Sequence, residues 1–269
     1  MEMIEKRIIE SFQMKAGIAM KQIMLITDGC SNVGESPVMA AALARQEGIT
    51  VNVVGIVDYG TIGELGSVEI EEIARAGGGM SRMSGTRQLA QTMQMMTRKT
   101  VVQTIQHAVN KELRQILGQT DTAVEDLPPD TRSQVVEVID ELSETSALEV
   151  VLLIDASASM RPKLAAVEEA IRDMMLSLGA RQGTSRIAVF HFPGAHSGEE
   201  AVMDMDWTTE LTGARSIFQK LTMRGATPTG PAILKVMEFF RYGTLEGHGS
   251  SNWLKESDRG EGMLGDYVV

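Results

Sequence analysis

Residues 149–160 read EVVLLIDASASM, a short apolar run followed by an acid and two alternating hydroxyls. The run from Val150 to Ile154 is typical of a strand that is buried on both faces of a sheet. Asp155, Ser157 and Ser159 follow where such a strand meets a loop, so their oxygens can turn toward one point. Hard cations prefer oxygen ligands, and the stretch therefore predicts a metal site. The same residue types also serve as N-caps of helices, which is the alternative interpretation.

The composition indicates a globular protein in a reducing compartment. Hydrophobic residues make up 43% of the 269 residues and charged residues 23%, which is enough apolar material for a core. The single cysteine, Cys30, cannot form an internal disulfide, and no secretion signal is recognisable, so we expect a cytoplasmic protein. No apolar run reaches the length of a membrane span, and a formal net charge of -11 disfavours nucleic acid and anionic lipid as partners. Basic partners or a bound cation fit this charge better.

Strands and helices alternate along the chain, which is the pattern of a parallel α/β sheet. An apolar strand at residues 23–26 runs into Thr27, Asp28 and Gly29, so a second strand also ends on a carboxylate. The patterns predict further strands at 50–57, 80–84, 186–192 and 202–207, and helices at 37–47, 67–76, 87–117, 164–178, 209–221 and 231–241.

The remaining segments are expected to lie outside the sheet. Residues 119–146 form an acidic linker, in which apolar residues at helical spacing predict one docked helix. Residues 1–19 form an optional N-terminal helix or extension, and residues 242–269 a flexible tail. Three methionines of the long helix are expected to fill gaps in the core: Met93, Met95 and Met96.

Two separated motifs resemble those of one known family. The pattern Asp155-x-Ser157-x-Ser159 after an apolar strand resembles the metal-ion-dependent adhesion site of von Willebrand factor type A domains. These domains place a metal-binding threonine in a Gly-x-Thr-x-Thr-like loop that opens a helix, and Thr227 matches it. Their next strand ends in Thr-Asp-Gly, whose acid corresponds to Asp28 near the start of this chain. The resemblance is closest to the YabS-like members of the family.

The threonine loop departs from the family pattern at two positions. Arg224 and Ala226 surround Gly225, where the family often has paired glycines. This departure concerns the mobility of the loop and leaves its threonine in place.

The elements stand in a different order from that of the family. Residues 20–118 supply the later strands and helices, residues 147–241 supply the earlier ones, and no element occurs twice. The resemblance therefore implies one circularly permuted type A domain over residues 20–241, with residues 119–146 as the new join. Two degenerate tandem type A domains with a scaffold role are the alternative.

The implied fold is an α/β, doubly wound, mostly parallel Rossmann-like sheet. In strand order 3-2-1-4-5-6, the strands that end at Asp155 and Asp28 are neighbours at the switch point, where ligand sites form. The resemblance implies that Ser157 and Ser159 bind Mg²⁺ directly, that Thr227 binds it directly or through water, and that both aspartates bind it through water. Mn²⁺ and Ca²⁺ are alternative ions.

The resemblance implies a protein-binding module without catalytic activity. In such a module, Mg²⁺ completes its coordination with an Asp or Glu of a partner protein, and relatives of this type work with ATPases or chaperone-like assemblies. A Mg²⁺-dependent hydrolase of phosphate esters is the alternative. Gly77–Gly79 follow a helix and so make a poor phosphate cradle. Arg161 and Lys163 are the nearest basic residues, and a helix start on the surface explains them as well as a phosphate contact does. Exchange of halves through the acidic join would give a domain-swapped homodimer.

Overall fold

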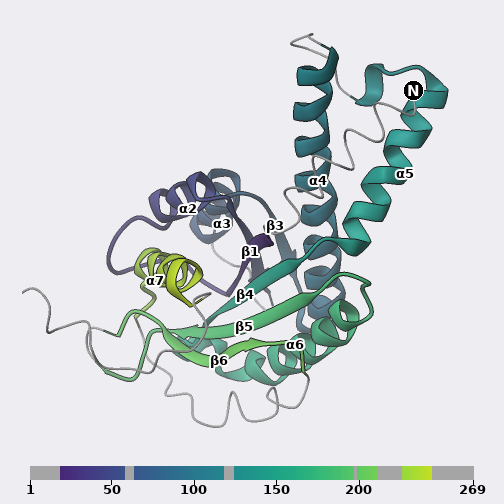
Figure 1. The fold of residues 1–269 in the computed structure, drawn as a ribbon. Helices are drawn as coiled ribbons and strands as arrows, with labels where there is room; N and C mark the ends of the chain where they lie inside the picture. The colour runs from purple at the N-terminus through teal and green to yellow at the C-terminus, as the bar shows by residue number, and fades with distance from the viewer. Residues whose placement is uncertain (1–18, 58–63, 118–123, 197–198, 211–225, 244–269) are drawn as a thin grey trace, which may run out of the picture.

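The computed structural model describes residues 19–57, 64–117, 124–196, 199–210 and 226–243. A six-stranded sheet in the order β3-β2-β1-β4-β5-β6 forms its centre (Figure 1). The strands are β1 (Met20–Thr27), β2 (Ile49–Ile56), β3 (Gly78–Ser84), β4 (Leu148–Asp155), β5 (Ser185–Phe192) and β6 (Val202–Thr208). Neighbouring strands are parallel except for the β5–β6 pair, which is antiparallel. The predicted mostly parallel α/β sheet is therefore confirmed.

Helices cover both faces of this sheet. They are α2 (Pro37–Gln46), α3 (Glu64–Ala76), α4 (Leu89–Leu117), α5 (Pro129–Thr145), α6 (Leu164–Gly179) and α7 (Thr229–Tyr242). Short 3₁₀ turns occupy Thr86–Gln88, Val124–Asp126 and Ala158–Lys163, labelled η1, η2 and η3. Alternate strand residues point to opposite faces, and one core cluster joins the sheet to α4, α5 and α6 while the other joins it to α2, α3 and α7. The fold is doubly wound, as the sequence predicts.

The central pair of strands comes from distant parts of the sequence. β1 and β4 run parallel with Ile26 beside Ile154, and every residue of β4 is buried. Both strands therefore end at the same edge of the sheet. The strand order is unchanged when the first three strands are exchanged with the last three, so it does not distinguish a permuted domain from an unpermuted one.

The acidic join contains the helix α5, which packs on α4. α4 and α5 lie side by side and extend beyond the sheet (Figure 1). Val135, Val138 and Ile139 of α5 are buried in this contact, whereas Val136 is 43% exposed. The helix expected in the join is thus confirmed. The helical spacing that predicted it included Val136, which lies outside the apolar face.

Some expectations need correction or fall outside the described residues. Met93 and Met96 are buried as predicted, but Met95 is 41% exposed because it lies on the solvent side of α4. The predictions for residues 1–18, 211–225 and 244–269 lie outside the described ranges. Within those ranges, no helix has the length and apolar character needed to cross a membrane.

Candidate metal centre

Asp155 lies at the carboxyl end of β4 and has no exposed surface. Its Oδ2 accepts a hydrogen bond from the Thr27 hydroxyl at 2.7 Å, and its Oδ1 accepts one from the Ser157 amide at 2.8 Å. Thr27 is the last residue of β1, so the bond to Asp155 joins the two central strands at their ends. Thr27 positions the carboxylate of Asp155. It belongs to the Thr-Asp-Gly motif, but it was not among the predicted metal ligands.

Asp28 supplies a second carboxylate at the same edge of the sheet. The Ser159 hydroxyl donates to Asp28 Oδ1 at 2.8 Å, and the hydroxyls of Ser157 and Ser159 lie 3.1 Å apart. Four of the five predicted residues, Asp28, Asp155, Ser157 and Ser159, therefore form one hydrogen-bonded group. Ser159 is its exposed member, whereas Asp155 and Ser157 are buried.

Thr227 lies on a loop that is fixed against the loop after Asp28. Its amide donates to Asn32 Oδ1 at 2.8 Å, and its carbonyl accepts hydrogen bonds from the Asn32 amide at 3.2 Å and the Ser31 hydroxyl at 3.1 Å. The start of α7 also packs closely on the loop after Asp28. Gly230 lies so near this loop that a Cβ there would collide with the carbonyl of Glu35. The structure thus places buried Thr227 on the adjoining loop, where hydrogen bonds of its backbone hold it.

Lys163 occupies a position that the sequence analysis did not predict. Its ammonium donates to Asp28 Oδ2 at 2.6 Å, and only 13% of its side chain is exposed. A surface helix start, one of the two explanations open for this lysine, therefore does not describe its position. The cause is η3, a 3₁₀ turn that contains Pro162 and leads the chain from Ser157 to α6. Arg161, in the same turn, is exposed as expected.

Burial dominates the electrostatics of Asp155. Loss of water around the carboxylate raises the pKa of Asp155, while the hydrogen bonds from Thr27 and Ser157 lower it and the charge of Asp28 raises it further. The net effect is a raised pKa, so the ionised form is costly in the absence of a nearby cation. A buried carboxylate in this condition is stabilised by positive charge.

The residues fit a hard divalent cation in their chemistry. The group offers two carboxylates and two hydroxyls, all oxygen donors, and one of the carboxylates is fully buried. In the part of the chain that the structure describes, no three His, Cys, Asp or Glu side chains gather into a metal-binding cluster. A metal centre at this edge would therefore depend on the serine hydroxyls as well as on the aspartates.

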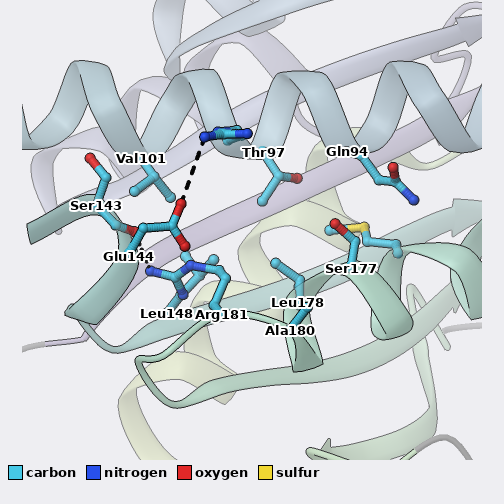
Figure 2. Close-up of a pocket in the computed structure, with 12 residues that line it drawn as sticks. Gln94, Thr97, Val101, Ser143, Glu144, Leu148, Ser177, Leu178, Ala180 and Arg181 are labelled. Atoms are coloured by element: carbon cyan, nitrogen blue, oxygen red, sulfur yellow. Dashed lines mark hydrogen bonds and ion pairs between the residues drawn. The ribbon is translucent and has the colours of Figure 1, made fainter. Parts of the chain in front are cut away.

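A hollow of about 170 Å³ lies at the opposite end of β4, between α4, α5 and α6 (Figure 2). Its charged residues are engaged in structural contacts. Arg181 donates to the carbonyls of Ser143 and Ser146 at the end of α5, and Glu144 lies 3.7 Å from Arg98. Ligand sites of doubly wound sheets form at the carboxyl ends of strands, so this hollow is not part of the candidate centre.

Comparison with known proteins places the chain in a family. The chain is 48% identical over 214 residues to the uncharacterized protein YabS of Bacillus subtilis (strain 168), and the match covers 80% of this chain and 86% of YabS. The protein belongs to the YabS family. The expected relation to YabS-like proteins is confirmed, and no protein-family model matches the chain.

A solved structure supports the same fold for this chain. The crystal structure of an uncharacterized protein from Alicyclobacillus acidocaldarius aligns with a TM-score of 0.77 at 42% identity, covering 84% of this chain and 95% of that one. A structure of mussel byssus proximal thread matrix protein 1 with a zinc-occupied MIDAS motif aligns with a TM-score of 0.25 at 14% identity, covering 77% of this chain and 43% of that one. A likeness this low carries no argument about the fold or the site.

Proposed function

We propose that this YabS-family protein is a metal-ion-dependent protein-binding module of the von Willebrand factor type A kind. The observation that carries the proposal is the hydrogen bond between Ser159 and Asp28, which are 131 positions apart in the sequence. It joins the Asp155-x-Ser157-x-Ser159 motif to the aspartate of the Thr-Asp-Gly motif at one edge of the sheet. Two motifs that resemble parts of one metal site thus lie together in space.

We further propose that the domain is circularly permuted. The support comes from the order of the motifs in the chain, since the strand order is the same under either arrangement. In the described residues each half contributes three strands to one sheet, which favours a single domain over two degenerate tandem domains. Residues 119–146 would then be the segment that joins the original termini.

The residues have distinct roles in this proposal. Ser157 and Ser159 would hold a Mg²⁺ ion directly, Asp155 and Asp28 would hold it through water, and Thr227 would contribute from the adjoining loop. The bound ion would supply a positive charge that attracts an anionic group. Exposed Ser159 marks the side from which a partner's Asp or Glu could approach. Mn²⁺ and Ca²⁺ stay as alternative ions, and an ATPase or chaperone-like assembly is the proposed kind of partner by analogy.

A phosphate-ester hydrolase receives less support. Phosphoryl transfer needs cationic groups that are free to contact phosphate. Lys163 is the ammonium within the centre, and it is bound to Asp28. We therefore do not assign a catalytic role to any of these residues.

The test compares capture of proteins by immobilised wild type, Asp155→Asn and Asp140→Asn, each in Mg²⁺ and in EDTA. Asp140 lies exposed on α5, so its variant is a matched change of charge away from the centre. We expect the same protein to be retained by wild type and Asp140→Asn in Mg²⁺ only, and to be lost with Asp155→Asn. Retention that is equal in Mg²⁺ and EDTA would contradict the proposal, as would Mg²⁺-dependent hydrolysis of p-nitrophenyl phosphate that Asp155→Asn abolishes.

A further inference from the structure

Lys163 brings a positive charge into the candidate centre itself. Its ammonium lies 2.6 Å from Asp28 Oδ2 and 3.5 Å from the carbonyl oxygen of Ile56 at the end of β2. Both charged side chains are enclosed, with 13% of Lys163 and 2% of Asp28 exposed. An ion pair that is this far removed from solvent is screened much less than a surface pair. Lys163 therefore belongs to the charge of the centre.

The turn that provides the hydroxyls also provides this cation. Ser157 directly precedes η3, Ser159 lies inside it and Lys163 is its last residue, so one short segment places all three. The two carboxylates and one ammonium give the group a net charge of -1, where the aspartates alone would give -2. With a divalent ion bound, the group would carry a net charge of +1. The same group without Lys163 would carry no net charge.

We propose that Lys163 makes the binding of metal and the binding of an acidic partner cooperative. The inference rests on the proposed function, because it assumes that the centre binds a divalent ion. The ammonium repels the ion and so lowers the affinity of the free protein for Mg²⁺. The remaining positive charge attracts a carboxylate to the occupied centre. Coupling between two ligands is reciprocal, so a carboxylate that neutralises this charge also tightens the binding of the metal.

The experiment is a calorimetric titration with Mg²⁺ in chloride and in acetate at equal ionic strength, where acetate is the carboxylate probe. Lys163→Met removes the charge and keeps a long side chain, whereas Lys163→Arg keeps the charge. Arg161→Met is the matched control, because it removes an exposed charge from the same turn. Thermal unfolding in EDTA and in Mg²⁺ gives a second measurement on each variant.

We expect Lys163→Met to bind Mg²⁺ roughly tenfold more tightly than wild type in chloride, a factor within the usual range for coupled sites. Its melting temperature should fall in EDTA, since Asp28 loses its partner, and should rise more on addition of Mg²⁺. Acetate should tighten Mg²⁺ binding by wild type, Lys163→Arg and Arg161→Met, and much less by Lys163→Met.

The possible failures separate the inference from the proposed function. If wild type binds Mg²⁺ and Lys163→Met binds it equally or more weakly, the role of Lys163 is wrong and the metal centre stands. The same conclusion follows if acetate tightens binding equally in both proteins. If wild type binds no Mg²⁺ in either salt, the proposed function fails and the inference with it. Should Lys163→Met fail to fold even with Mg²⁺, its pairing with Asp28 is structural and the inference is overturned.

Discussion

At the scale of single residues, Asp155 shows how burial and charge oppose each other in the candidate centre. Its carboxylate has no exposed surface, and two protein hydrogen bonds replace only part of its lost hydration. The raised pKa of Asp155 follows from this deficit. Folding without metal therefore places the carboxylate of Asp155 where its ionised form is less favourable than it is in water.

Asp155→Asn should stabilise the metal-free protein at neutral pH. Burial raises the folded-state pKa of Asp155 above the ordinary value of an aspartate, so the contribution of this group to stability is present below the ordinary value and is lost as pH rises through the folded-state pKa. The advantage of the variant in EDTA should consequently be larger at about pH 7 than at about pH 4. The Asn amide can be accommodated because the Thr27 hydroxyl lies 3.3 Å from the Gly29 carbonyl and can donate there instead.

Thermal unfolding of both proteins across this pH range, in EDTA, is the measurement. An advantage that shrinks toward neutral pH would contradict the assignment of burial as the cause. Addition of Mg²⁺ should reverse the order of stability, since wild type alone retains the full set of carboxylates.

The grouping of Asp28, Asp155, Ser157 and Ser159 at one edge of the sheet was predictable because a strand end precedes each of them in the sequence. Asp155 and Asp28 both follow apolar runs, and Ser157 and Ser159 follow Asp155 at alternate positions. The position of Lys163 was not predictable in this way. The direction of η3 depends on packing against residues that are distant in sequence, and a six-residue turn has no periodic apolar pattern.

At the scale of elements, the end of α5 is held by a cluster of hydrogen bonds at the amino edge of the sheet. Arg181 reaches from the α6–β5 connection to the carbonyl of Ser143 at 2.6 Å (Figure 2). It also donates to the carbonyl of Ser146 at 3.0 Å and to the Ser185 hydroxyl at 2.7 Å. Burial lowers the pKa of Arg181, and the charge of Glu144 opposes this effect. The last carbonyls of a helix lack partners within the helix, so the guanidinium satisfies groups that would otherwise be unpaired.

Arg181→Met should lower the free energy of unfolding by about 2 kcal/mol, because hydrogen bonds from a charged donor are lost and acceptors are left without partners. Arg98→Met is the control from the same hollow. Its ion pair with Glu144 is 3.7 Å long and Arg98 is 82% exposed, so its removal should cost less than about 1 kcal/mol. Urea unfolding of both variants measures the difference. Equal destabilisation would show that Arg181 does not fix the end of α5.

The elements themselves follow from local patterns more closely than their contacts do. α2 begins at Pro37 after its Ser36 N-cap, as the sequence indicates, and helical spacing in the acidic join predicts α5. Arg181 stands 38 positions after Ser143 and 35 positions after Ser146, and no local sequence pattern encodes its contact with them. Met95 was misplaced because a methionine is compatible with either side of an amphipathic helix.

At the scale of the whole molecule, the two halves of the chain meet in one sheet. β1 pairs with β2 from its own half along Lys21–Thr27 and with β4 from the other half along Met20–Ile26. The sequence could predict this neighbourhood only through the resemblance, because periodicity identifies strands and not their partners. α5 connects the halves and packs on α4 through Val135, Val138 and Ile139.

Deletion of residues 119–122 should produce a domain-swapped dimer. The deletion shortens the connection between α4 and η2, so α5 can no longer fold back onto α4 of its own chain. The same contacts would then form between two copies, with β4 to β6 exchanged. Size-exclusion chromatography with light scattering should show a dimer, whereas deletion of four residues from the C-terminus should leave the mass unchanged. A folded monomer after the first deletion would contradict this expectation.

The central claim is that the ends of β1 and β4 hold one divalent ion together. The most direct measurement is the Mg²⁺-induced change in melting temperature for wild type, Asp28→Asn, Asp155→Asn and the double variant. Binding to the folded state alone stabilises it by about 2.7 kcal/mol when free ion is a hundredfold above Kd. Each single variant should lose most of this gain, and the double variant should lose little more, because residues that share one ligand are not additive. If Asp28→Asn keeps the full Mg²⁺ shift while Asp155→Asn loses it, the two aspartates do not share a site and the claim is wrong.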